Sequence, residues 1–402
     1  MTYHAGMRGM PAYEREPYLT ELDTVVVEVG EMAGQPWAVL EDTVLYPEGG
    51  GQPADHGRLG EAHVVDVRTH EGAVRHLLER PVAPGPTRVS VDWARRFDHM
   101  QQHTGQHLLT AIALGRFGWR TTAFHLGPAL SDVELDVPTL SRDQLDALED
   151  AVAAEIRAAR PVRARRVSPE EAALLPVRSR LLPEGFSGDL RLIEIEGLDL
   201  NTCGGTHVRC TAEIEGLKLV ATEAMRGGTR VFFVAGGRLR RRLGTHEARN
   251  AALRAVLDTG DDELVAIVRL KLEQLQGSQR RVRQLEEEAA ETRASALATV
   301  PERVVEAHFD GVDGAFLQKL ARAVVAAAPA KVVLLTASRG ETHLLVRAAG
   351  GRGPREVPAR GKQVLGVFDG KGGGSGRLVQ GKVGSFARRE EAIHLLRQAV
   401  GS

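Results

Sequence analysis

The chain has 402 residues, of which 43% are hydrophobic and 26% charged, and these values are ordinary for a globular protein of about two or three domains. The formal net charge of −1 excludes a uniformly basic surface, so an anionic partner such as a nucleic acid would have to bind at local basic patches. Two cysteines exclude a disulfide framework and suit a reducing cytosol. Residues 1–22 contain no apolar stretch typical of a signal peptide, and the most apolar run, residues 323–337, is too short to cross a membrane. We therefore expect a cytoplasmic protein that makes no contact with a membrane.

Residues 1–95 are predicted to form a small antiparallel β-barrel. Apolar and polar residues alternate there in short segments separated by Gly and Pro turns, and this alternation is typical of half-buried strands. The alternating segments are residues 25–29, 38–40, 63–67 and 88–91. A glycine-rich stretch that contains Gln52, residues 46–57, interrupts the pattern; a loop whose glycines allow close approach to a ligand is one interpretation, and a hairpin with an exposed glutamine is the alternative.

The apolar spacing becomes helical over residues 97–114, and a second helix is predicted over residues 143–160. Ser141 is a suitable N-cap for the second helix, and Pro161 would end it. Three further strands complete an α+β unit in residues 96–240, and they are predicted at residues 190–195, 213–220 and 230–235.

Two distant pairs of side chains are the most informative feature of the chain. His103 and His107 form one pair and Cys203 and His207 the other, each with a spacing that places both side chains on one face of a helix. Three imidazole nitrogens and one thiolate are a donor set that suits zinc better than hard cations. Either pair alone is weak evidence, but together they predict a metal centre with one Zn²⁺ per chain.

Residues near these two pairs offer alternative metal ligands and an unusual backbone path. Gly204 and Gly205 allow a tight backbone path between Cys203 and His207. His99 lies four residues before His103, so these two histidines are a competing metal-binding pair. Cys210 falls outside the spacing and is interpreted as a small buried hydrophobic residue.

Residues 241–299 are predicted to form a helical arm. Residues 261–297 contain no proline and are rich in Glu, Arg, Leu and Ala, which favours one long helix or a short antiparallel coiled-coil hairpin. The heptad pattern is imperfect, since Val268 and Leu275 recur at seven residues whereas Lys271 and Ser278 are polar. We interpret this segment as an arm or dimerisation element.

Residues 300–402 are predicted to form an α/β domain that ends in a glycine-rich segment. The segment at residues 368–377 would form a turn whose backbone N–H groups face an anion, with charge added by Lys371 and Arg377. A flexible loop is the alternative. The basic runs at residues 160–166 and 238–242 are further candidate anion-binding patches, or ordinary solvated faces. The fold class predicted for the whole chain is multidomain α+β: barrel, zinc-containing domain, helical arm and C-terminal α/β domain.

Four segments carry a resemblance to a known family. Residues 103–109 and 203–211 resemble the metal motifs of alanyl-tRNA synthetase editing domains and of their freestanding AlaX-type relatives. Residues 46–57 resemble the glycine-rich loop of the same family, and residues 121–127 resemble a motif of its freestanding members. Thr-Gly-Gln replaces the synthetase Thr-Ala-Thr between the two histidines, which fits the freestanding type better. The C-terminal glycine-rich segment is similar to a domain shared by these synthetases and DHH-type phosphoesterases, although we find no Asp-His-His motif.

The resemblance implies a hydrolase that removes the wrong amino acid from tRNA(Ala) in trans, with serine the first expected substrate and glycine the second. It implies a homodimer through the arm or the C-terminal domain. Two other classes stay open: a zinc hydrolase of another small ester, and a non-catalytic tRNA-binding protein that uses zinc as a fold element. Four protein ligands would close the zinc coordination sphere, which favours a structural or positioning zinc over one that activates water.

The resemblance also implies roles for particular residues. Gln52 and Thr121 are the expected catalytic residues, Gln52 by orienting the ester carbonyl or the attacking water and Thr121 by hydrogen bonding to the seryl hydroxyl. Ordinary packing is an equally good interpretation of each threonine. The expected substrate-binding residues are Gly50, Gly51, Thr122, His125, Gly204 and Gly205, and the expected tRNA-binding residues are Lys371 and Arg377.

Overall fold

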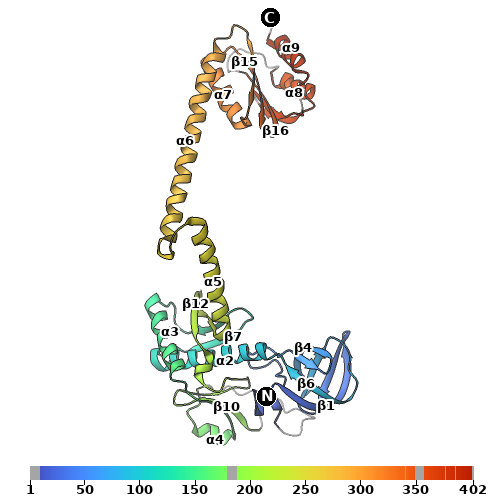
Figure 1. The fold of residues 1–402 in the computed structure, drawn as a ribbon, viewed down its shortest axis with the longest axis vertical. Helices are drawn as coiled ribbons and strands as arrows, with labels where there is room; N and C mark the ends of the chain where they lie inside the picture. The colour runs from blue at the N-terminus through green and yellow to red at the C-terminus, as the bar shows by residue number, and fades with distance from the viewer. Residues whose placement is uncertain are drawn as a thin grey trace. The chain divides into compact units, whose positions relative to one another are not determined.

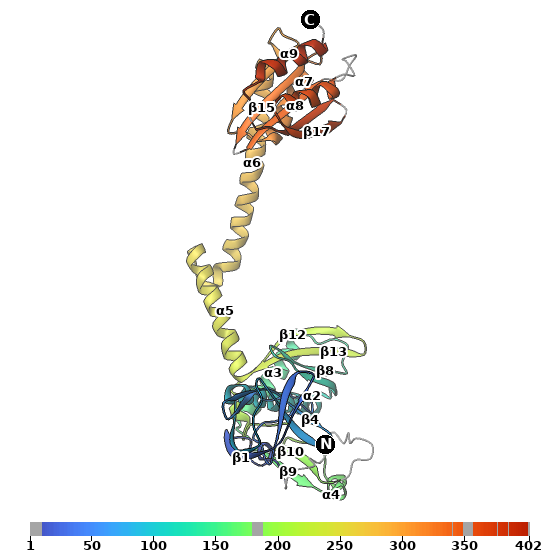
Figure 2. The ribbon, with the colours of Figure 1, turned by 90° about the vertical axis from the view of Figure 1, so that its right-hand side faces the viewer.

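The computed structural model describes residues 10–178, 188–339, 341–348, 357–375, 377–384 and 386–400. The chain divides into two compact units, Met1–Ala252 and Leu253–Ser402 (Figures 1 and 2). The predicted four-part division is finer than this and stays a prediction. Within the described residues, no helix is both long and apolar enough to span a bilayer.

The first unit begins with the predicted β-barrel, which follows a short helix, α1 (Ala12–Arg15). Six antiparallel strands close the barrel in the order β1-β2-β5-β4-β3-β6. The strands are β1 (Glu21–Met32), β2 (Gln35–Leu40), β3 (Gly57–Leu59), β4 (Ala62–His70), β5 (Ala73–Leu78) and β6 (Gly85–Val91). Their inward side chains, among them Val26, Leu78 and Val89, form one apolar core. The glycine-rich loop connects β2 to β3 across the barrel.

Helix α2 (Trp93–Phe117) extends beyond the predicted 97–114 at both ends. The Asp92 side chain accepts a hydrogen bond from the Arg95 N–H at its start, and Gly118 adopts a left-handed conformation (φ 72°) at its end. Almost every residue from His99 to Ala113 is buried, so α2 is the central helix of the unit.

Two sheets and helix α3 pack around α2, and helix α4 packs against the second sheet. One sheet has the order β12-β13-β8-β7 and the other β11-β10-β9. Helix α3 (Arg142–Arg157) begins with a capping box at Ser141, as predicted, but ends before residue 160. The remaining elements are β7 (Thr121–Leu126), β8 (Ser131–Leu135), β9 (Val162–Val167), α4 (Pro169–Leu174), β10 (Leu190–Ile195), β11 (Asp199–Thr202), β12 (Leu217–Met225) and β13 (Gly228–Ala235).

The strand expected at residues 213–220 is displaced. Thr211–Ile214 forms a single 3₁₀ turn instead, and Glu215 has a positive φ of 62°. The strand therefore starts only at Leu217, because the chain must reverse before it can pair with β13. The strand predicted at residues 190–195 is confirmed with its bounds unchanged.

The arm consists of α5 (Gly236–Leu257), a 3₁₀ turn (Asp261–Glu263) and α6 (Leu264–Ala298). Because α6 is one continuous helix of 35 residues, the hairpin alternative for residues 261–297 is wrong. Its last turns pack into the C-terminal unit through Ala290 and Ala294. Most of its other large apolar side chains are exposed.

The C-terminal unit is an α/β sandwich. Its five-stranded sheet has the order β14-β15-β16-β18-β17, and only the β14–β15 pair is parallel. Val333 and Leu335 of β15 face the α7 side of the sheet, whereas Val332 and Leu334 face the α8 and α9 side. The elements are β14 (Val304–Asp310), α7 (Gly314–Ala327), β15 (Val332–Arg339), β16 (Glu341–Ala348), α8 (Val357–Val367), β17 (Lys371–Ser375), β18 (Leu378–Lys382) and α9 (Arg389–Val400).

The predicted anion-binding turn at residues 368–377 is wrong in its local structure. Lys371–Ser375 is the edge strand β17, which pairs with β18. A β-carbon on Gly372 or Gly374 would collide with backbone carbonyls of β18, so close strand approach explains these glycines. Lys371 and Arg377 are both exposed.

Candidate metal centre and adjoining pocket

The four predicted metal donors meet in the interior of the first unit. His103 and His107 lie on successive turns of α2, and Cys203 and His207 lie in the loop that follows β11. All four are buried, and one donor atom from each lies within 4.8 Å of the others. The second pair is not helical as the spacing suggested; a loop brings its two side chains together.

The donor geometry fits a tetrahedral zinc ion. The Sγ atom of Cys203 is 3.3 Å from Nε2 of His103 and 3.3 Å from Nε2 of His207. Zn–S and Zn–N bonds of about 2.3 and 2.0 Å at a tetrahedral angle would place sulfur and nitrogen roughly 3.5 Å apart. The residues present therefore suit this ion in donor type and in approximate spacing.

Gln52 links the glycine-rich loop to the centre. Its Oε1 lies 2.9 Å from Nδ1 of His103 and accepts the backbone N–H of Thr206 at 3.0 Å, while its Nε2 donates to the Thr206 hydroxyl at 2.9 Å. An amide oxygen can only accept, so Nδ1 of His103 carries the hydrogen and Nε2 presents its lone pair to the centre. The glutamine is only 1% exposed, which contradicts the interpretation of an exposed hairpin residue.

The other two histidines also have polar neighbours. The hydroxyl of Thr104 lies 3.2 Å from Nδ1 of His207. A carboxylate oxygen of Asp199 lies 3.7 Å from Nδ1 of His107, which has no hydrogen-bond partner among the described residues. Arg178 holds that carboxylate through two hydrogen bonds of 2.7 and 2.9 Å. Such neighbours orient ligand imidazoles, and the sequence offered no sign of them.

A buried arginine holds the Cys203–His207 loop in place. Arg191 is 3% exposed and donates from Nη1 to the carbonyls of Cys203 and Gly205, both at 2.8 Å. A β-carbon at Gly205 would collide with the His103 ring, so only glycine fits there. Sequence reasoning missed Arg191 because its two acceptors are backbone atoms of a loop.

Electrostatics favour a thiolate at the centre. Burial alone would raise the pKa of the Cys203 thiol, but its electrostatic interactions with the surrounding histidines outweigh burial and hold the pKa well below its usual range. Burial lowers the pKa of His207 to about 3. The centre therefore holds cysteine in the form that binds metal ions.

The glycine-rich loop is anchored to α2. Asp55 is fully buried, accepts the Tyr46 backbone N–H at 2.7 Å and forms an ion pair with the equally buried Arg96. Gly50 and Gly51 have φ angles of 57° and 80°, in the region that favours glycine. A β-carbon at Gly51 would come within 2.7 Å of the Phe124 ring.

A pocket of about 310 Å³ opens beside this loop. Its lining brings together three of the predicted site residues, Gly51, Gln52 and His125, and adds Phe124, whose ring centre is 6.0 Å from that of His103. Gly204, with its neighbour Gly205, belongs to the metal-centre loop instead. Phe124 was missed because an aromatic residue in a strand usually indicates core packing.

The two predicted threonines lie at the start of β7 and are not among the residues that line the pocket. The Thr121 hydroxyl donates to that of Thr110 at 3.2 Å, and the exposed Thr122 donates to the Glu134 carbonyl at 3.3 Å. Gly50 is also absent from the lining, although it is the neighbour of Gly51. The proposed roles of these residues stay predictions.

His99 and Cys210 are outside the donor cluster. His99 is buried, no hydrogen bond reaches its Nδ1 within the described residues, and burial, aided by Arg95, lowers its pKa to about 4. Cys210 is half-buried and pairs through its backbone with Pro161, so its interpretation as a small buried hydrophobic residue is confirmed only in part.

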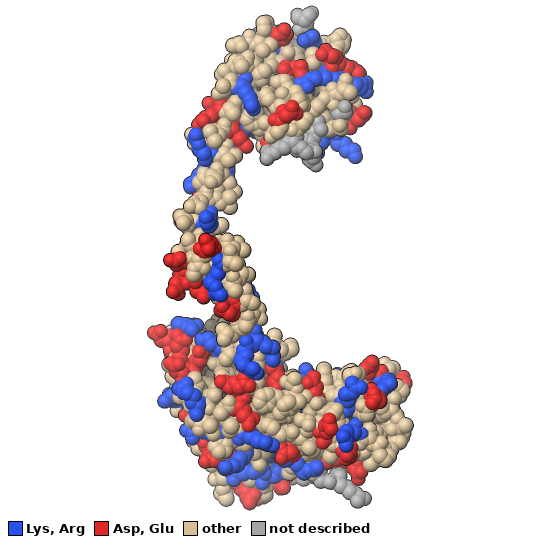
Figure 3. Space-filling view, viewed as in Figure 1, with Lys and Arg blue, Asp and Glu red and all other residues tan. Residues whose placement is uncertain are grey.

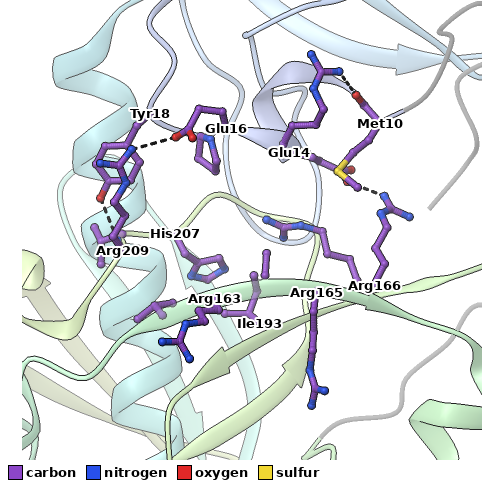
Figure 4. A pocket seen from close by; sticks show the side chains of 16 residues that line it. Met10, Glu14, Glu16, Tyr18, Arg163, Arg165, Arg166, Ile193, His207 and Arg209 are labelled. Atoms are coloured by element: carbon purple, nitrogen blue, oxygen red, sulfur yellow. Dashed lines mark hydrogen bonds and ion pairs between the residues drawn. The ribbon is translucent and has the colours of Figure 1, made fainter.

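A second pocket of about 450 Å³ reaches His207 from another side (Figure 4). Arg166 pairs there with Glu14 at 2.6 Å, and Arg209 stacks on the Tyr18 ring at 3.9 Å. Arg163 and Arg165 point away from these groups in Figure 4. The basic run at residues 160–166 is therefore divided between two faces of β9, as alternation along a strand requires.

The fold and the site together define an α+β protein with a buried four-residue cluster that could hold a metal ion, and with a glycine-rich pocket beside that cluster. Residues 190–231 match the family described as "Threonyl and Alanyl tRNA synthetase second additional domain". The alanyl-tRNA editing protein Aarsd1 of Mus musculus is 33% identical over 407 residues, which cover 97% of this chain and 98% of that protein. The chain belongs to the alanyl-tRNA editing protein family.

Other relatives match different parts of the chain. Alanyl-tRNA editing protein AlaX-M of Methanosarcina barkeri is 32% identical over 223 residues, covering 52% of this chain and 90% of that protein. The crystal structure of the C-Ala domain from Aquifex aeolicus alanyl-tRNA synthetase covers 25% of this chain and 91% of its own, at 21% identity and a TM-score of 0.22.

Proposed function

We propose that this protein is a trans-editing hydrolase that deacylates mischarged tRNA(Ala) in the cytoplasm, with Ser-tRNA(Ala) the main substrate and Gly-tRNA(Ala) the second. The observation that carries the proposal is that Gln52 belongs to both the metal centre and the pocket. An aminoacyl end in that pocket would lie beside the amide that orients a metal ligand. The family membership supports tRNA(Ala) as the carrier of the amino acid.

The need for such an enzyme is physical. A synthetase pocket built for alanine cannot strongly reject an analogue that only adds a hydroxyl, so its discrimination against serine stays near ~10². A second site that recognises the hydroxyl must remove the error. We assign that recognition to Thr121, on the strand that also carries Phe124 and His125.

One Zn²⁺ held by His103, His107, Cys203 and His207 would supply a fixed positive charge beside the pocket. Four protein ligands would leave it no open position, so we assign it a positioning role. Gln52 would then orient the ester carbonyl or the attacking water. Backbone groups of Gly50 and Gly51, with those of Gly204 and Gly205, would bind the aminoacyl end, and Thr122 and His125 would contact it from β7.

The rest of the tRNA would bind at local basic patches. Figure 3 shows Lys and Arg interspersed with Asp and Glu on the face in view, in keeping with the net charge of −1. We assign contacts to Lys371 and Arg377, which are exposed beside strand β18. These would add affinity without taking part in hydrolysis.

We also propose a homodimer through α6. Four of its apolar side chains follow a spacing of three and four residues, a fifth follows seven residues later, and all are at least 40% exposed: Val265, Val268, Leu272, Leu275 and Val282. Sedimentation analysis of the double variant L272D/L275D should show a monomer where the unmodified chain shows a dimer. A monomeric unmodified chain would refute the proposal.

The first test is deacylation of Ser-tRNA(Ala) compared with Ala-tRNA(Ala). We expect rapid release of serine only, abolished in His103→Ala and unchanged in His63→Ala, which replaces an exposed barrel histidine. No turnover of either substrate with tRNA still bound would indicate a non-catalytic tRNA-binding protein. Hydrolysis of free seryl esters without preference for tRNA would indicate a zinc hydrolase of other substrates.

A further inference from the structure

We propose that His125, oriented by Asp132, accepts the proton of the attacking water during ester hydrolysis. The inference rests on the proposed function, because it assigns a step of that reaction to a side chain in the pocket. It concerns a pair of residues that takes no part in binding the metal.

The pair has the geometry of an oriented imidazole. Nδ1 of His125 lies 2.9 Å from a carboxylate oxygen of Asp132, on the neighbouring strand β8. Since a carboxylate only accepts, Nδ1 carries the hydrogen and Nε2 is left with its lone pair. Within the described residues, no hydrogen bond to Nε2 is found. The imidazole is thus fixed in the tautomer of a proton acceptor.

The carboxylate itself is held from the opposite strand. Asp132 is 8% exposed, and Nε of Arg230 on β13 lies 3.6 Å from the same oxygen that meets His125. Arg230 also forms an ion pair with Glu134 at 2.6 Å. The donors of His125, Asp132 and Glu134 are close enough to bind a cation, but this guanidinium already supplies the positive charge there. The cluster is therefore better suited to orienting the imidazole than to binding a metal ion.

His125 lies where a substrate would meet it. It lines the 310 Å³ pocket together with Gln52 and Gly51, and its side chain is 59% exposed. The charged groups around it are Asp132 and Glu134 from β8, Arg230 from β13 and Glu48 from the glycine-rich loop. The His125 side chain is therefore open to water in the pocket.

The step balances without any co-reactant. The water oxygen bonds to the ester carbonyl carbon as its proton passes to Nε2 of His125. When the tetrahedral intermediate collapses, the bond from that carbon to the ribose oxygen breaks, and Nε2 returns the proton to the leaving ribose oxygen. Free amino acid and tRNA with an intact terminal ribose are the products, and His125 ends as it began.

The test compares the pH dependence of kcat and KM for Ser-tRNA(Ala) in the unmodified chain, in His125→Gln and in Asp132→Asn. His125→Gln should lower kcat about 10²- to 10⁴-fold and remove the loss of rate at acid pH, with KM and zinc content unchanged. Added imidazole should restore part of the rate in His125→Gly. Asp132→Asn should lower kcat with KM unchanged, because an amide can present its NH₂ group and favour the wrong tautomer.

Several outcomes would overturn the inference. A His125→Gln variant with unchanged kcat and an unchanged acid limb would exclude the proton transfer, and an effect on KM alone would indicate only a binding role. His63→Gln is the matched control, and a loss of rate there equal to that in His125→Gln would indicate a general loss of folding. If the unmodified chain hydrolyses no aminoacyl-tRNA, that result would refute the proposed function itself.

Discussion

At the scale of single residues, the centre depends on side chains that bind no metal themselves. Gln52 fixes the tautomer of His103, Arg191 holds the carbonyls of the donor loop, and Asp199 stands beside His107. None of them has a sequence spacing that links it to a ligand. The four donors were predicted from their residue types and spacing. Gln52 was expected at the site from the family resemblance, but its contact with His103 was not, and Arg191 and Asp199 were not predicted at all, because these contacts form only through the fold.

Replacing Gln52 by alanine should weaken zinc binding about 10- to 100-fold, because His103 loses the acceptor that fixes its tautomer. The measurement is competition for zinc with a chromophoric chelator. Gln106→Ala is the matched control: this glutamine, on α2, is buried like Gln52, but among the described residues the one hydrogen bond of its side chain is to Thr110. Equal losses in both variants would show that the effect comes from packing.

The barrel should lose stability in acid through His76. This histidine is fully buried, donates from Nδ1 to the Ala38 carbonyl and has Thr43 at Nε2; burial lowers its pKa to about 4. As the pH falls below about 6.5, the unfolded chain takes up the proton first, so the folded state is disfavoured. The stability contributed by the neutral imidazole is complete above that pH and declines as the pH falls towards 4.

Urea unfolding followed by tryptophan fluorescence should therefore give a free energy about 1–2 kcal/mol lower at pH 5 than at pH 7 from this residue alone. Trp37, on the strand next to His76, reports on the barrel. His76→Gln should have a smaller pH dependence, whatever its stability at pH 7. An unchanged pH dependence of the free energy of unfolding would mean that other groups cause the loss of stability in acid.

At the scale of elements, regular structure was predictable and loops were not. The alternation of the barrel strands and the capping box of α3 are local patterns, and both were confirmed. The loop at residues 203–207 and strand β17 were misread, because their backbone paths are set by Arg191 and by β18 respectively. Both segments contain glycines, but the sequence does not show which neighbouring group leaves no room for a β-carbon there.

Gly205→Ala should abolish tight zinc binding while leaving the helical content intact, because its β-carbon would collide with the His103 ring. Circular dichroism and metal analysis of the purified variant provide the two readouts. Gly115→Ala serves as the control: it lies on α2 with open space around it, and should raise stability by up to about 1 kcal/mol with zinc unaffected. Full zinc occupancy in the Gly205 variant would mean that the loop can shift.

At the scale of the whole molecule, chemistry and tRNA affinity are assigned to different units. All four metal donors and the pocket lie in the unit Met1–Ala252, whereas Lys371 and Arg377 lie in the unit Leu253–Ser402. The sequence predicted the barrel, the α+β unit and the C-terminal α/β fold, because each has its own hydrophobic pattern.

The double variant K371Q/R377Q should weaken binding of deacylated tRNA(Ala) and reduce the salt dependence of its affinity by about two phosphate contacts. The rate of deacylation at saturating substrate should be unchanged, because neither residue lies in the unit that holds the centre. Binding titrations at several salt concentrations give the slope. An unchanged slope would show that the tRNA meets other basic residues.

The amide of Gln52 has a consequence for how such a protein can be altered. The barrel contributes the loop that forms the pocket wall, while α2 and the loop after β11 contribute the donors, so one hydrogen-bond set joins recognition to metal retention. A change at Gln52 that reshapes the pocket for another amino acid would also remove the hydrogen bond that orients His103. The barrel cannot be exchanged as an independent recognition module; barrel and donor cluster must be transferred together as one functional piece.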